Sequence, residues 1–232
     1  MAPFPLKQKK LTDLNFGKYL LIVVSAIVIS GLSYYLRTTY LDVDVVFSSF
    51  LRCIRMVMVY LFFCFGILIF RYRYKLKDFG IQKKNLLHTT ILGIGLYTVP
   101  LLAFITHVGN EEFDSYFVEG KRNLHTLSLI FLSFLIFVMA AVTDIWTRGF
   151  VLLITAKIRS PLSAIILQNI TWFLIHIYEI LILIHSFGIV LSVALTIFLG
   201  VGGDLIVLKY RNVLGLAVGH IYLNLVFIIY IL

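Results

Sequence analysis

The chain has 232 residues, of which 61% are hydrophobic and only 13% carry a charge. Soluble domains are closer to half apolar and a quarter charged, so this composition excludes an ordinary soluble protein. The formal net charge of +9 does not indicate a nucleic-acid partner, because the basic residues follow the loops between apolar blocks.

These apolar blocks predict an all-α, polytopic membrane protein with about seven transmembrane helices. Crossing about 30 Å of hydrocarbon takes roughly 20 apolar residues in a helix, and each block is near or above that length. The blocks lack a strict alternation of apolar and polar residues, which favours helices. In chain order the blocks are Phe16–Leu36, Cys53–Phe70, Leu86–Phe104, Leu127–Ala156, Leu162–Ile184, Phe187–Leu208 and Val213–Leu232.

The distribution of charge predicts the orientation. Basic residues gather before the first block and in the loops after the second, fourth and sixth blocks, whereas an acidic cluster at 111–119 follows the third. Basic loops usually stay in the cytoplasm, so the N-terminus is expected inside and the C-terminus outside. The first three blocks then form an N-terminal membrane region, residues 1–126, and the last four a second unit, residues 127–232.

The second unit carries ionisable residues where hydrocarbon is expected. Such groups are costly in a membrane and are a hypothesis for a functional site. They come in pairs four residues apart, so the members of each pair share one helix face. The pairs are Asp144 with Arg148, Trp172 with His176, and His220 with Asn224.

Each pair also has a structural explanation. Asp144 and Arg148 would neutralise each other as an ion pair within one helix. A histidine on an apolar helix is more often a packing residue held by hydrogen bonds than a catalyst, and Glu179 is a candidate partner for His176. The third pair would equally join neighbouring helices by hydrogen bonds. Asp204 follows a glycine-rich stretch and is expected at a fraying helix end.

Together the pairs would supply the groups that hydrolysis needs. A carboxylate or a histidine can act as general base toward water. A second histidine and an amide can donate hydrogen bonds to a developing oxyanion. Two histidines and a carboxylate are also a catalytic zinc set, so a metal held by His176 and His220 stays open. A small proton-coupled transporter is a third interpretation, although no inverted repeat supports it.

The order of these motifs resembles the CPBP family, which comprises CAAX prenyl endopeptidases, bacteriocin-processing proteins and Abi-type immunity proteins. The resemblance covers roughly residues 140–232. The family has two glutamates followed by three residues and an arginine, then Phe-xxx-His, then His-xxx-Asn or His-xxx-Asp. Thr143, Asp144 and Arg148 stand in the first motif, Trp172 and His176 in the second, and His220 and Asn224 in the third.

This resemblance implies an intramembrane endopeptidase that activates water to cleave a membrane-associated peptide or protein, such as a prenylated CAAX-type substrate. His176 would assist the base, and His220 and Asn224 would stabilise the tetrahedral intermediate. Arg148 would hold the acidic segment in place. The resemblance implies no cofactor and no catalytic metal, and membrane lipid would surround the helices.

One departure from the family bears on this activity. Thr143 occupies the place of the glutamate that would act as base, and threonine does not take a proton from water at neutral pH. Asp144 is the next residue, but in a helix it points about 100° away. Glu179, three residues after His176, is a weaker candidate for the base. The alternative is a catalytically degenerate scaffold or regulator that binds another membrane protein.

Overall fold

The computed structural model describes residues 14–40, 45–106 and 125–231. Within these ranges every regular element is a helix and there is no strand, which confirms the all-α prediction. The basic N-terminal residues 1–13 and the acidic cluster at 111–119 lie outside the described residues.

Five helical segments in the described ranges are long and apolar enough to cross a membrane. Two of them change from α-helical to wider π-helical turns partway along their length. The segments are α1 (Phe16–Tyr40), α2 with η1 and η2 (Val45–Met56, Val57–Phe65 and Ile67–Arg71), α3 (Leu86–Ile105), α6 with η5 and α7 (Thr126–Asp144, Ile145–Leu152 and Leu153–Ile158), and α10 (Ile189–Tyr210).

The predicted fifth crossing, Leu162–Ile184, is not one straight helix. It consists of α8 (Pro161–Ile175) and α9 (Ile177–Phe187), which are bent by 79° and together make a candidate sixth span. The break comes at His176, whose φ of −108° and ψ of 13° leave the α-helical range. The last helix, α11 (Leu214–Ile231), contains a shorter apolar stretch.

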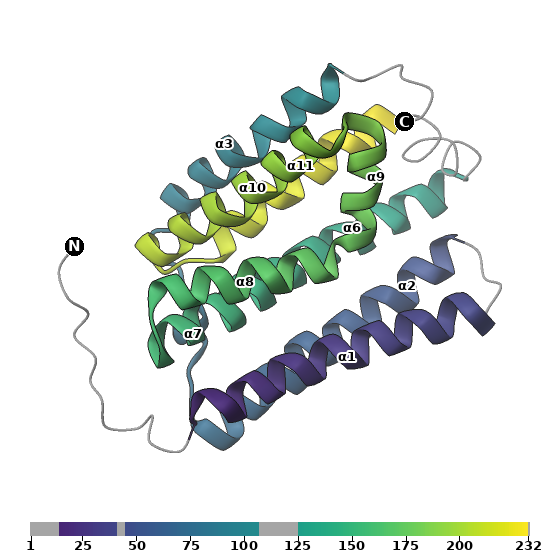
Figure 1. The fold of residues 1–232 in the computed structure, drawn as a ribbon. Coiled ribbons are helices and arrows are strands. Elements are labelled where there is room, and N and C mark those ends of the chain that lie inside the picture. The colour runs from purple at the N-terminus through teal and green to yellow at the C-terminus, as the bar shows by residue number, and fades with distance from the viewer. Residues whose placement is uncertain (1–13, 41–44, 107–124, 232) are drawn as a thin grey trace.

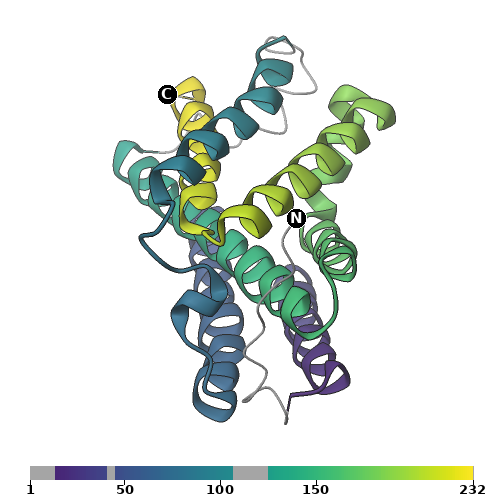
Figure 2. The same ribbon diagram turned by 90° about the vertical axis from the view of Figure 1, so that its left-hand side faces the viewer.

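The segment α6–η5–α7 runs through the middle of the bundle (Figures 1 and 2). Its π-helical part is completely buried from Trp146 to Leu152. On one side Tyr60 stacks on Trp146 with ring centroids 4.1 Å apart, and Tyr19 donates a hydrogen bond to the Phe150 carbonyl. On the other side the segment packs against a second apolar cluster from α3, α10 and α11. Polar residues on this segment are therefore shielded by helices on both sides.

The start of α1 and the connections before α3, α8 and α11 lie at the same end of the bundle (Figure 1). Lys157 Nζ donates to Asp78 Oδ1 at 2.6 Å, and Asn212 Nδ2 donates to the Gln82 carbonyl at 2.5 Å. Arg159 lies 4.6 Å from the ring of the first residue of α1. The basic loops predicted on one side of the membrane are thus neighbours in the fold.

The ion pair between Asp78 and Lys157 makes the free energy of unfolding depend on pH. Burial alone would raise the pKa of Asp78, but the hydrogen bond from Lys157 and a second from the Lys75 N–H lower it below its usual value. The stabilisation is therefore present above the unfolded pKa of about 3.9 and is lost as the pH falls through the folded pKa. We expect Asp78→Asn to cost about 0.2–1 kcal/mol at pH 7 and almost nothing below pH ~3. Thermal unfolding in detergent at both pH values measures this difference.

Helices α3 and α11 pack closely because glycines remove side chains between them. A Cβ at Gly219 would lie 2.6 Å from the Gly93 carbonyl oxygen, and a Cβ at Gly215 would lie 2.5 Å from the Thr90 nitrogen. Gly215 and Gly219 are four residues apart and share one face of α11. Small residues at this spacing allow close packing of membrane helices.

Candidate functional site

Asp144 and Arg148 lie at the centre of a buried network of charges. Both side chains are completely buried and form an ion pair across the junction of α6 and η5. Arg148 also donates to the Leu199 carbonyl at 3.0 Å, and its Nε lies 3.5 Å from Asp204 Oδ1 on α10. The other oxygen of Asp144 lies 3.1 Å from His220 Nδ1 on α11. The network thus joins α6, η5, α10 and α11.

Asp204 was interpreted from the sequence as a residue of a fraying helix end, and this is wrong. It lies inside α10 with no exposed side chain, and Asn169 Nδ2 donates to its Oδ2 at 2.9 Å. The preceding glycines continue the helix instead of ending it. A Cβ at Gly203 would lie 2.6 Å from Arg148 Nη2, so the missing side chain makes room for the guanidinium.

The side chains of His220 and Asn224 both make contacts within this part of the bundle. The His220 ring stacks on Tyr97 with centroids 5.0 Å apart, in addition to its contact with Asp144. Asn224 Nδ2 donates to the His220 carbonyl at 3.1 Å, a bond within its own helix. The pair therefore serves packing and hydrogen bonding in this structure.

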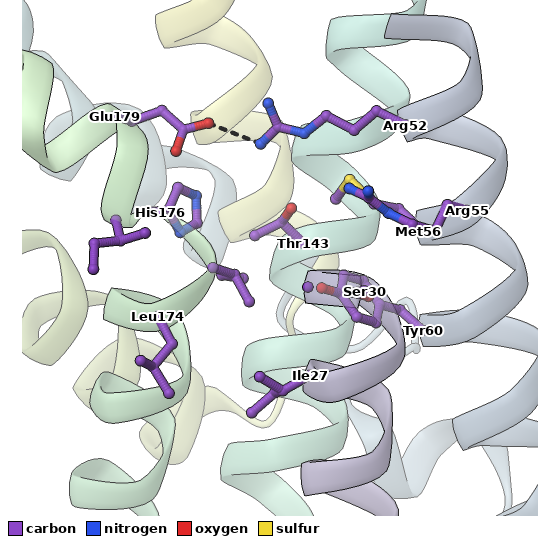
Figure 3. Close-up of a pocket in the computed structure, with 13 residues that line it drawn as sticks. Ile27, Ser30, Arg52, Arg55, Met56, Tyr60, Thr143, Leu174, His176 and Glu179 are labelled. Atoms are coloured by element: carbon purple, nitrogen blue, oxygen red, sulfur yellow. Dashed lines mark hydrogen bonds and ion pairs between the residues drawn. The ribbon is translucent and has the colours of Figure 1, made fainter. Parts of the chain in front are cut away.

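His176 lines a separate cavity at the bend between α8 and α9. Its ring stacks on Trp172 at 4.2 Å, and its Nδ1 lies 2.9 Å from the Trp172 carbonyl. The cavity has a volume of about 220 Å³ and opens between α1, α2, α6 and the α8–α9 bend (Figure 3). Its described lining residues are Ile27, Ser30, Gly31, Arg52, Arg55, Met56, Tyr60, Thr143, Leu174, Ile175, His176, Ile177 and Glu179.

The polar end of this cavity is formed by α2 and α9. Arg52 Nη2 donates to Glu179 Oε1 at 2.8 Å, and both side chains are partly exposed. The second Glu179 oxygen is buried and accepts no hydrogen bond from another described residue. Glu179 therefore pairs with Arg52, and no hydrogen bond to His176 is found among the described residues.

Sequence reasoning missed Arg52 and Arg55 as site residues. The predicted second span began at Cys53, which placed Arg52 in a loop. Helix α2 instead begins at Val45, so both arginines project from a helix, three residues apart and on one face. The apolar residues at 45–51 were the signal that could have extended the span.

Neighbouring residues of α6 therefore face different environments. Thr143 lines the cavity with His176, whereas Asp144 belongs to the buried network with Arg148 and His220. Among the described lining residues, the carboxylate in the cavity is that of Glu179. His176 and Glu179 thus line the cavity, whereas Asp144 and His220 contact each other in the buried network.

No three His, Cys, Asp or Glu side chains in the described ranges gather as a metal site would require. His176 lines the cavity, whereas His220 contacts Asp144 in the buried network. Comparisons with protein-family models, with curated proteins and with solved structures find no match to this chain.

Proposed function

We propose that this chain is a membrane protein with a CPBP-like core that binds a membrane-associated peptide or protein without cleaving it. The observation that carries the proposal is that Thr143 lines the same cavity as His176, while Asp144 is held by Arg148 and His220. A general base must lie within hydrogen-bond reach of the water that it activates. Thr143 cannot act as that base, and both oxygens of Asp144 contact Arg148 or His220 instead.

The two residues that the family resemblance assigns to the oxyanion, His220 and Asn224, support the same proposal. Catalysis of this kind needs hydrogen-bond donors that already point at the place where negative charge develops. Asn224 donates to its own helix, and His220 contacts Asp144. Neither residue is among those that line the His176 cavity. The contacts of Asp144, His220 and Asn224 would then hold the helices together around a binding site.

The orientation predicted from charge belongs to this proposal. Seven crossings would place the N-terminus in the cytoplasm and the C-terminus outside, with the bent pair α8–α9 and helix α11 each counted as one crossing. Support comes from the contacts that bring the basic connections together at one end of the bundle. Such a grouping of basic residues is typical of the cytoplasmic side.

The test uses purified protein in liposomes with a library of prenylated C-terminal peptides and leader-type peptides. We expect mass spectrometry to find no cleavage by the wild type, and fluorescence anisotropy to find binding of a subset. His176→Ala should weaken this binding roughly tenfold, which corresponds to about 1.4 kcal/mol. The matched control is His88→Ala, since His88 is exposed on α3 away from the cavity. Cleavage by the wild type that His176→Ala abolishes would contradict the proposal.

A second candidate function is an endopeptidase that uses Glu179 as the base. The observation in its favour is that Glu179 and His176 line the same cavity and that one Glu179 oxygen accepts no hydrogen bond from another described residue. Against it, Arg52 would hold the carboxylate ionised and weakly basic. If this candidate is right, Glu179→Gln abolishes cleavage of a peptide that it still binds.

A further inference from the structure

Basic side chains outnumber acidic ones at the end of the bundle where α3 begins and α10 ends (Figure 1). Asp78 is the acidic residue of the described connections 71–85, 157–160 and 209–213, and it already pairs with Lys157. The basic residues of these connections are Arg71, Arg73, Lys75, Lys77, Lys83, Lys84, Lys157, Arg159, Lys209 and Arg211. The connections therefore carry a positive charge that their own acidic side chain does not balance.

Hydrogen bonds hold the start of α3 against the end of α10. Asn85 Nδ2 donates to the Tyr210 carbonyl at 3.0 Å, and Asn212 Nδ2 donates to the Lys84 carbonyl at 2.8 Å. Two segments that are far apart in the sequence thus lie side by side. Their exposed basic side chains, which form no ion pair with another described residue, are those of Lys83, Lys84 and Lys209.

An apolar strip follows these lysines along α3. Leu87 and Ile91 are 69% and 61% exposed, and their spacing of four residues puts them on one face of the helix. Helices α3 and α10 are each long and apolar enough to cross a membrane. Their ends at Leu86 and Tyr210 therefore lie where hydrocarbon gives way to lipid headgroups. A ligand at this place would meet positive charge at one end and apolar side chains at the other.

We propose that the surface formed by Lys83, Lys84, Lys209, Leu87 and Ile91 binds an anionic phospholipid. Lysines next to the end of a membrane helix attract negatively charged headgroups, and the ammonium group binds phosphate as a point charge. The headgroup contacts the three lysines, and an acyl chain lies along the two apolar side chains. This site goes beyond the proposed peptide binding, because it lies on α3 and α10, and neither helix lines the cavity at the α8–α9 bend.

Native mass spectrometry of the full chain in detergent measures the binding. The probes are dioleoylphosphatidylglycerol, which is anionic, and dioleoylphosphatidylcholine, which has the same acyl chains and no net charge. The variants are the pair Lys84→Gln with Lys209→Gln and the charge-retaining pair Lys84→Arg with Lys209→Arg. The matched control, Lys75→Gln with Lys77→Gln, removes the same charge from exposed positions elsewhere at this end. Inorganic phosphate as a competitor separates a lipid headgroup from free phosphate.

We expect the wild type to bind the anionic lipid at least roughly tenfold more tightly, since each lysine near a membrane surface contributes about fivefold. The glutamine pair should lose most of this preference, whereas the arginine pair and the matched control should keep most of it. Both lipids are measured on the same sample, so a loss of folded protein lowers the two signals alike.

Three results would overturn the inference. Equal affinity of the wild type for the two lipids would show that the surface does not select charge. An equal loss of preference in the glutamine pair and in the matched control would show a diffuse attraction without a site. Displacement of the anionic lipid by inorganic phosphate at the same concentration would show that a free anion, and not a lipid, is the ligand.

Discussion

Replacing Arg148 by methionine is expected to destabilise the protein by about 3–5 kcal/mol, the usual cost of breaking a buried ion pair from one side. Arg148 is the cation between Asp144 and Asp204, and all three side chains are completely buried. Without it, the carboxyl groups of both aspartates would remain buried without their cation. Thermal or denaturant unfolding in detergent should show this loss, and Arg148→Met should express poorly.

A charge-neutral variant separates this effect from a change in packing. Arg148→Met combined with Asp144→Asn and Asp204→Asn removes the guanidinium and both carboxyl groups and should recover most of the lost stability, because replacing a whole buried ionic group is often neutral. Arg71→Met, at an exposed arginine, should change stability by less than about 0.5 kcal/mol. Wild-type stability of the single Arg148 variant would show that the network does not hold the bundle together.

Gly219→Ala is expected to destabilise the protein by about 1–3 kcal/mol, the range for overpacking a tight contact. The added Cβ would lie 2.6 Å from the Gly93 carbonyl oxygen, and backbone atoms on a packed helix cannot move away cheaply. Helices α3 and α11 would have to separate, which would also disturb the stacking of Tyr97 on His220. The midpoint of thermal unfolding in detergent measures the loss.

Gly95→Ala is the matched control for this prediction. Gly95 lies on the same helix as Gly93, but a Cβ there would meet no atom within 4 Å. Alanine is favoured over glycine in a helix interior by up to about 1 kcal/mol, so this variant should be neutral or slightly more stable. If both alanine variants behave alike, the close packing of α3 on α11 does not contribute to stability.

The positions of the helices could be predicted well from the apolar blocks, because membrane crossing requires about 20 apolar residues whatever the tertiary structure. The predicted block Leu127–Ala156 corresponds closely to the segment Thr126–Ile158. The bend at His176 could not be predicted, since the apolar residues continue across it without a proline or glycine. The start of α2 was missed because Arg52 and Arg55 interrupt the apolar pattern.

The candidate site could be predicted only in part, because its contacts join different helices. Spacing along a helix indicates which side chains share a face, and in this way Asp144 and Arg148 were recognised as a pair. Spacing does not indicate which neighbouring helix that face meets. The glycines at 200–203 illustrate this, because they resembled a helix end and instead admit Asn169 and Arg148.

The apolar blocks and the spacing of the polar pairs are enough to predict a helical membrane protein with costly polar residues in its last helices. Which of those residues meet depends on how the helices pack. This packing brings His220 into contact with Asp144 and Arg52 of α2 into contact with Glu179, and Thr143 lines the same cavity as His176. Adjacent residues in a helix point about 100° apart. Whether Thr143 or Asp144 reaches the cavity therefore depends on how the helix is rotated against its neighbours, and packing over the whole bundle sets that rotation.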